Sequence, residues 1–343
     1  MANVFRSVLL FVSFCLNPVY AESLEFIDTQ AQFDPADSDF KGSLETMLKE
    51  MDRVGISKTL IVPPPFPFKN ARTYDAEIIV KIIGDKKNRF GFLGGGESLN
   101  LAILETAPNE VTATVQAKFR ARCEEILSLG ALGFGEVTAE HLSLPLMKGS
   151  GLKHFHNSAE ADHPLLRLLA DIAAEKDVPI DIHFDIFPAT MATPSRLADG
   201  NPAVLKENQA AFERLLSHNR KARFTWAHLG SDPARQRTPA LMRDLLTRHA
   251  NLYSAFRISG YGSDPTLVLD ENESLKPEWL KLIEDFPDRF TLHTDIFYVS
   301  SWPPKRGPKK SHELAQRLLR QLPPNIARKL AYENAQQIYK LKD

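Results

Sequence analysis

The stretch LEFIDTQAQFD, residues 24–34, decides how the rest of the chain is interpreted. Its apolar residues predict a buried β-strand over residues 24–32. Side chains alternate between the two faces of a strand, so Gln30 and Gln32 point the same way near its carboxyl end. In a parallel α/β barrel the carboxyl ends of the strands carry the chemistry. The two glutamines are therefore candidate site residues.

Seven more short runs of this kind follow, and a polar turn and a helical period separate each from the next. The predicted strands span residues 24–32, 57–62, 89–95, 131–138, 178–185, 222–229, 251–257 and 289–296. Strands that are apolar on both faces and alternate with helices predict a parallel sheet, and eight such units predict an α/β fold, the (β/α)8 TIM barrel. An open doubly wound sheet is the alternative, but no G-x-G-x-x-G motif follows the first strand. The glycine-rich GFLGGGES, residues 91–98, is interpreted as a tight turn.

The composition is that of an ordinary globular protein with a sizeable core. The chain has 343 residues, of which 43% are hydrophobic and 25% charged, and its formal net charge is −1. A charge so close to zero, without long runs of one sign, argues against nucleic acid or an anionic membrane as a partner. We expect a small-molecule substrate, and a homo-oligomer stays open.

The first 23 residues, MANVFRSVLLFVSFCLNPVYAES, predict a secretory signal peptide, because a basic start and an apolar run precede small residues. The apolar run is shorter than the ~20 residues that span a bilayer. We expect residues 1–21 to be cleaved and residues 22–343 to form a single domain. Cleavage would remove Cys15 and leave Cys123 as the one cysteine. A chain without a possible internal disulfide favours a periplasmic location, with secretion as the alternative.

Titratable side chains lie at the carboxyl ends of four other predicted strands. Glu136 lies in GFGEVT, His183 in DIHFD, His228 in WAHLGS and Asp295 in LHTDIF. A lone histidine on a buried strand is more often a satisfied core residue than a ligand. Two histidines and two carboxylates on four strands favour a divalent cation, which would compensate the buried charge. Spacing alone leaves the two interpretations evenly matched.

The separated motifs resemble the amidohydrolase superfamily, in its amidohydrolase-related branch of metal-dependent hydrolases. The family's I-D-x-H-x-H strand is matched by residues 27–32, its M-D-x-x-G-I segment by 51–56, its A-H-x-G by 227–230 and its closing N-A-x-x-x-(F/Y) helix by 334–339. The strand-five histidine and the strand-eight aspartate match as well. The resemblance covers essentially the whole mature chain and implies a TIM barrel with metal-dependent chemistry.

The resemblance breaks at positions 30 and 32, where the family has two metal-binding histidines. An amide offers a metal only a weakly donating carbonyl oxygen, so we expect this metal position to be empty or very weak. The chain then is similar to the mononuclear amino-sugar deacetylases of the superfamily, which implies one divalent ion, expected to be zinc, held by Glu136, His183 and His228. Gln30 and Gln32 would either bind substrate or water, or fill space as polar plugs.

The resemblance implies a hydrolase of a C–N or C–O bond, of the amide, lactone or ester type, with Asp295 as general base. Arg257, in SAFRISG at the end of strand seven, is a candidate to bind a substrate carboxylate or phosphate, and a salt bridge to Asp295 or Glu136 is the alternative. Two other functions stay open. One is a non-catalytic small-molecule-binding barrel that has lost its metal site. The other is a metal-dependent decarboxylase of an aromatic or unsaturated acid, against which the missing histidines count.

Overall fold

The computed structural model describes residues 24–69, 72–144, 155–301 and 308–342. The predicted signal peptide lies outside these ranges. Its cleavage, and the single-domain organisation of residues 22–343, therefore stay predictions. Within the described ranges, no helix combines the length and the apolar character needed to cross a lipid bilayer.

Eight parallel strands form the barrel, in agreement with the fold predicted from the sequence. The strands, the third of which is in two parts, are β1 (Phe26–Phe33), β2 (Ile56–Ile61), β3 (Phe90–Phe92), β4 (Gly94–Gly95), β5 (Phe134–His141), β7 (Pro179–Phe184), β10 (Arg223–Leu229), β11 (Leu252–Phe256) and β12 (Phe290–Leu292). Their order is β3-β2-β1-β12-β11-β10-β7-β5-β4, with parallel pairing throughout. Only Leu93 separates β3 from β4, so the chain itself joins the two ends of this path.

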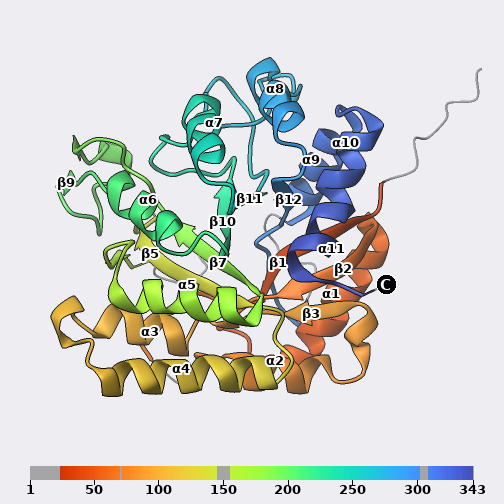
Figure 1. Cartoon of the computed structure of the whole chain (residues 1–343). Coiled ribbons are helices and arrows are strands. Elements are labelled where there is room, and N and C mark those ends of the chain that lie inside the picture. Colours follow the sequence, from red (N-terminus) through yellow and green to blue (C-terminus); the bar gives the residue numbers. More distant parts are fainter. Residues whose placement is uncertain (1–23, 70–71, 145–154, 302–307, 343) are drawn as a thin grey trace, which may run out of the picture.

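Helices connect the strands and, apart from α11, lie around the outside of the sheet (Figure 1). They are α1 (Phe40–Val54), α2 (Ala76–Ile83), α3 (Ser98–Glu105), α4 (Ala113–Ser128), α5 (Pro164–Lys176), α6 (Gln209–His218), α7 (Pro239–Arg248), α8 (Pro277–Asp285), α9 (Pro308–Arg320), α10 (Pro324–Arg328) and α11 (Asn334–Tyr339). The short strands are β6 (Asn157–Ser158), β8 (Met191–Ala192), β9 (Val204–Leu205) and β13 (Phe297–Tyr298).

Local sequence sets the limits of helix α1. The side chain of Asp39 accepts a hydrogen bond from the backbone of Gly42 and caps the amino end. Gly55 ends the helix with φ +76°, a left-handed conformation that glycine adopts without steric cost, and its N–H donates to the carbonyl of Met51. The apolar face of α1, which includes Leu44 and Met51, is buried in the main hydrophobic core together with residues of the strands.

The carboxyl-terminal helix α11 closes the inside of the barrel. Apolar side chains of the first three strands, including Ile27, Leu60 and Leu93, form one cluster with Ile338 and Tyr339 of this helix. The helix is anchored at its first residue, because the Asn334 amide donates 2.8 Å hydrogen bonds to the carbonyls of Pro287 and Phe290. The N-A-x-x-x-(F/Y) motif of residues 334–339 therefore has a structural role.

Glycines 94 and 95 confirm the predicted strand over residues 89–95, and the interpretation of residues 91–98 as a tight turn is wrong for them. These residues continue the third strand as β4 and pair with β5. The following Gly96 lies where a Cβ atom would come within 2.1 Å of the Pro63 carbonyl oxygen. Close approach of two backbones, and not a chain reversal, explains this part of the glycine run.

The eighth strand is shorter than the predicted 289–296 and ends at Leu292. The backbone N–H and the hydroxyl of Thr294 donate to the buried carboxylate of Asp28, over 2.9 and 2.6 Å. Asp295 then donates its N–H to the carbonyl of Gln30 over 2.9 Å. Asp295 thus lies three residues beyond the end of β12 and stays bonded to β1, which the chain pairs with again at β13.

Candidate metal centre

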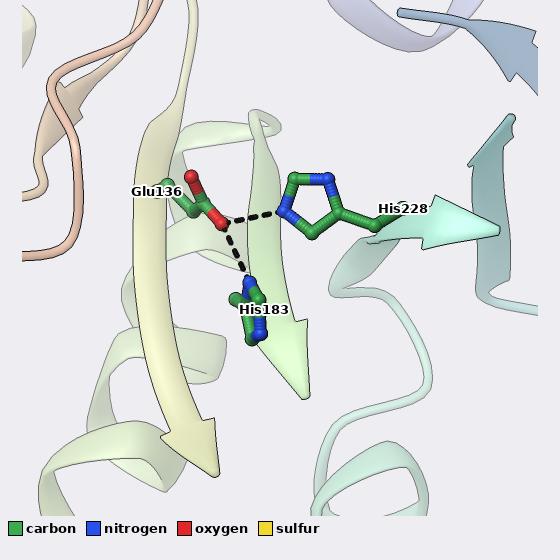
Figure 2. A group of neighbouring side chains, drawn as sticks. All are labelled: Glu136, His183 and His228. Carbon is green, nitrogen blue, oxygen red and sulfur yellow. Dashed lines mark hydrogen bonds and ion pairs between the residues drawn. The ribbon is translucent and has the colours of Figure 1, made fainter. Parts of the chain in front are cut away.

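The carboxylate of Glu136 is the meeting point of the site. Its Oε1 accepts hydrogen bonds from His183 Nδ1 over 3.0 Å and from His228 Nε2 over 2.9 Å. Figure 2 shows one oxygen of this carboxylate, from β5, facing the imidazoles contributed by β7 and β10. We call Oε1 and the two imidazoles the imidazole face. The structure thus brings together the three residues that the sequence predicts as metal ligands.

The other oxygen of the same carboxylate is bound by the two glutamines. Gln30 Nε2 donates to Glu136 Oε2 over 2.7 Å, and Gln32 Nε2 donates to it over 3.2 Å. Gln32 Nε2 also lies 3.2 Å from Asp295 Oδ1. We call Oε2, the two amides and Asp295 Oδ1 the amide face. The two glutamines point inward together, as alternation predicts, and both bind the carboxylate.

Arg257 pairs with the predicted general base. Its Nε lies 3.2 Å from Asp295 Oδ2, and its Nη1 donates to the hydroxyl of Ser231 over 3.0 Å. The salt bridge to Asp295 that the sequence left as an alternative is therefore present. Asp295 consequently has one oxygen toward an amide and the other toward a guanidinium.

Two of the site residues have an unusual backbone conformation. The φ angles of His228 and Asp295 are +64° and +52°, in the left-handed region that non-glycine residues seldom adopt. His228 donates its backbone N–H to Nε2 of the buried His293 over 3.1 Å. Burial, together with the nearby His228 and Arg257, holds the pKa of His293 well below its usual range, so this ring is neutral and accepts that bond. Such strain is often found at functional sites.

Burial and charge act against each other at Glu136. Burial alone would raise the pKa of this carboxyl, but His228 and His183 hold it well below its usual range. Burial alone would lower the pKa of His183, but Asp185 and Glu136 outweigh it. The pKa of His183 is raised to about 9 as a result. In the absence of a metal, Glu136 is therefore ionised and His183 carries a proton at neutral pH.

The imidazole face fits one divalent ion. Ligand atoms of Glu136, His183 and His228 all lie within 4.8 Å of one another. A tetrahedral ion with ligands at ~2.0–2.1 Å separates them by about 3.3 Å. The carboxylate-to-imidazole separations of 2.9 and 3.0 Å are close to this value. The amide face has only amide and carboxylate groups, and its amide NH₂ groups point toward the carboxylates, so it offers a metal few good donors.

Asp185 is a candidate positioning residue that the sequence analysis missed. Its Oδ2 accepts the backbone N–H of Leu142 over 2.8 Å and lies 3.4 Å from His183 Nε2, the ring nitrogen that faces away from Glu136. A carboxylate on the second nitrogen is the usual partner of a metal-binding histidine. The signal is in the sequence, because the H-x-D spacing of DIHFD puts both side chains on one face of the strand.

The second missed acid, Asp181, lies one step deeper on the same strand. It is completely buried, and neither of its carboxyl oxygens has a hydrogen-bond partner among the described residues. Burial, and secondly the negative Glu136, raise its pKa well above the usual range. Asp181 is therefore harder to ionise than an ordinary aspartate.

The site opens to solvent on one side. Glu136 and the two glutamines are at most 2% exposed, whereas the side chains of His183, Asp295 and Arg257 are 14%, 13% and 25% exposed. A substrate would therefore meet these three residues first. A separate cavity of about 490 Å³ lies among the loops after β10 and β11. Its lining residues are Arg235, Gly262, Ser263, Asp264, Pro265 and Leu267.

Comparison with known proteins relates this geometry to a family. A sequence model described as amidohydrolase matches residues 105–341. The structure of 4-oxalomesaconate hydratase from Rhodopseudomonas palustris has a TM-score of 0.52 at 13% identity, with 92% of this chain and 95% of that chain covered. This likeness concerns the fold. No curated protein matches the sequence.

Two further structures have lower scores. An amidohydrolase from Burkholderia multivorans with bound Zn has a TM-score of 0.49 at 11% identity and covers 93% of this chain and 100% of its own. Amidohydrolase 2 from Bifidobacterium longum subsp. infantis has a TM-score of 0.47 at 12% identity, with the same coverage.

Proposed function

The chain belongs to the amidohydrolase family, and we propose that it hydrolyses a C–N or C–O bond of a small molecule with one divalent metal held by Glu136, His183 and His228. Membership of the family and the Glu/His cluster support a metal-dependent enzyme of the hydrolase type. An amide, a lactone or an ester is the class of substrate that we propose. The donor set of two imidazoles and one carboxylate suits zinc.

One observation supports the single-metal proposal above all others. Both imidazoles meet the same oxygen of Glu136, whereas the opposite oxygen is bound by two amides. An imidazole that loses a proton becomes a metal ligand, but an amide NH₂ group has no lone pair to offer. The site therefore has good donors for one ion and not for two.

The chemistry follows from the charges and the exposure of the residues. When bound, the divalent ion lowers the pKa of a water ligand toward ~7 and polarises the scissile carbonyl group. Asp295 would accept the proton of the attacking water and return one to the leaving group. Gln32 and Arg257 hold the two oxygens of this carboxylate in a fixed orientation. Asp185 would keep His183 in the tautomer that presents Nδ1.

Arg257 and the glutamines are also proposed to contact substrate. Arg257 is the most exposed cation of the site, and its guanidinium could exchange part of its contact with Asp295 for a substrate carboxylate. The Oε1 atoms of Gln30 and Gln32 are buried and have no hydrogen-bond partner among the described residues. They are available to a donor such as a substrate hydroxyl or N–H group. We propose a periplasmic location from the predicted signal peptide.

A non-catalytic barrel is a second candidate, and one observation favours it. Glu136 accepts hydrogen bonds from four side chains, so protein groups alone can satisfy its carboxylate. A protein that binds a small molecule but no metal would fit this arrangement. The two functions differ in metal content, which makes them separable by experiment.

The test measures zinc content and hydrolysis in the same preparations. Protein purified without chelator should contain one zinc per chain and hydrolyse at least one member of a panel of amides, lactones and esters. Glu136→Gln should lose both the zinc and the activity. Glu140→Gln is the matched control, because Glu140 lies on the same strand but binds His156 and Ser158 outside the cluster. A metal-free, inactive wild-type protein would overturn the proposal.

A further inference from the structure

We propose that Gln32 and Arg257 together take the place of a second cation in this site, so that the centre accepts a single ion. The inference rests on the proposed one-metal centre and adds roles for two residues that do not ligate it. It concerns the amide face, where Glu136 Oε2 and Asp295 Oδ1 approach the same amide nitrogen.

Gln32 occupies the space between the two carboxylates. Its Nε2 lies 3.2 Å from Glu136 Oε2 and 3.2 Å from Asp295 Oδ1. An NH₂ group has two hydrogens, so it can donate one to each carboxylate. A cation that bridged these oxygens would have to displace the amide. Gln32 therefore links the two carboxylates, as a bridging ion would, but it carries no positive charge.

Arg257 provides the positive charge that a bridging cation would bring. Its guanidinium lies on the other oxygen of Asp295, with Nε at 3.2 Å from Oδ2. Two serines hold it there, since Nη1 donates to Ser231 Oγ over 3.0 Å and Ser259 Oγ lies 2.9 Å from the same hydroxyl. With Asp185 behind His183, the carboxylates of the site carry three negative charges, and the guanidinium balances one of them. One divalent ion on the imidazole face then compensates the other two.

This arrangement predicts that histidines alone do not restore a second ion. A divalent ion on the amide face would need Asp295, whose charge Arg257 already neutralises, and it would be repelled by the guanidinium. The effect belongs to the positive charge and not to the shape of the side chain. Lysine at position 257 should therefore behave like arginine, whereas methionine should not.

The first experiment uses the otherwise unchanged protein and measures zinc affinity by competition with a chelating dye. Arg257→Met should bind its one zinc about tenfold more tightly or better, because a nearby positive charge is gone and Asp295 is released. Arg257→Lys should bind zinc as the wild type does. If Arg257 only braced the loops, Arg257→Met would bind zinc more weakly, and this result would overturn the inference.

The second experiment counts zinc ions per chain by mass spectrometry after gel filtration, on variants shown by thermal unfolding to be folded. Gln30→His/Gln32→His should hold one ion with Arg257 in place, one with Arg257→Lys added and two with Arg257→Met added. Two ions in all three variants, or one in all three, would show that the charge at position 257 does not control the second site.

These readouts do not depend on catalysis. A wild-type protein that binds one zinc but hydrolyses nothing would contradict the proposed function and leave this inference intact. A wild-type protein that binds no zinc would overturn both. The same affinity in Arg257→Met and the wild type would overturn the inference alone.

Discussion

The two oxygens of Glu136 lie in contrasting surroundings. On the imidazole face, Oε1 meets two rings contributed by β7 and β10. On the amide face, Oε2 meets two glutamines of β1. Both faces satisfy the carboxylate with two N–H donors, and each has one partly exposed member, His183 or Asp295. In the metal-free protein they are nearly equivalent as hydrogen-bond environments.

They differ in what happens when a proton leaves. An imidazole that gives up its proton presents a lone pair, so the donor becomes a metal ligand. An amide nitrogen has its lone pair delocalised and remains a donor at any ordinary pH. The imidazole face can therefore alternate between a hydrogen-bonded and a metal-bound state, whereas the amide face is fixed. Two carboxylate oxygens with the same number of hydrogen bonds can therefore differ in metal binding. Imidazole donors can become ligands, whereas amide donors stay hydrogen-bond donors.

The largest expected effect tests which group performs the chemistry. Asp295→Asn should lower kcat by about 10²–10⁴-fold, because an amide cannot accept the proton of water. Its zinc content should remain one per chain, since Asp295 is not a ligand in this account. Steady-state kinetics and metal analysis on one sample give both values. The control is Asp288→Asn, in an exposed ion pair with Lys329. Loss of zinc in Asp295→Asn would mean that the amide face contributes a ligand.

A smaller effect, on zinc affinity, is expected from Asp185, which contacts His183 on the side away from Glu136. Asp185→Asn should weaken zinc binding by about 10–100-fold, because the carboxylate that orients His183 is lost. Asp171→Asn, at an exposed carboxylate paired with His218, should bind zinc like the wild type. Competition with a chelating dye measures both. Unchanged affinity in Asp185→Asn would show that His183 needs no such support.

The pH dependence sharpens the contrast further. With its pKa raised to about 9, His183 is protonated at neutral pH in the metal-free protein and must lose this proton to bind zinc. Zinc affinity should therefore rise by up to about tenfold per pH unit from pH 7 to 9. The metal-free protein should lose stability over the same window, because the folded state binds the proton more tightly than the unfolded state does. Calorimetry follows both slopes, and slopes of the same sign would contradict the assignment.

The smallest effect belongs to the amide face. Gln32→Met removes one donor from each of Glu136 and Asp295, which should cost about 1–3 kcal/mol of unfolding free energy. Zinc content should remain one per chain. Gln209→Met, which loses a single bond to Glu213 on a helix, is the control and should cost less. A Gln32→Met protein without zinc would mean that the two faces are not independent.

The sequence predicts the barrel and the side chains that converge in it, because alternation and strand order fix which residues point inward. It places His183 and His228 correctly near the carboxyl ends of their strands. It is wrong for Glu136, which is the third residue of β5 because this strand begins at Phe134 and not at the predicted residue 131, and Gln30 lies in the middle of β1. It does not predict that Asp295 lies beyond its strand, because the bonds between Thr294 and Asp28 are between distant parts of the chain.

Contacts made by loops were equally inaccessible from the sequence. The segment between β7 and α6 contains the hairpin of β8 and β9 and joins a separate apolar cluster that includes Leu142 and Phe187. No regular period marks it, so it was not predicted. The partner of Arg257 also depends on loop geometry, and the sequence could only offer a substrate anion or a carboxylate as alternatives.

The most direct test of the two-face account is a crystal structure of the protein grown with zinc, with anomalous data collected at the zinc edge. The account predicts one peak per chain, within bonding distance of Glu136 Oε1, His183 Nδ1 and His228 Nε2. A second peak between Gln32 and Asp295, or no peak at the imidazole face, would contradict it.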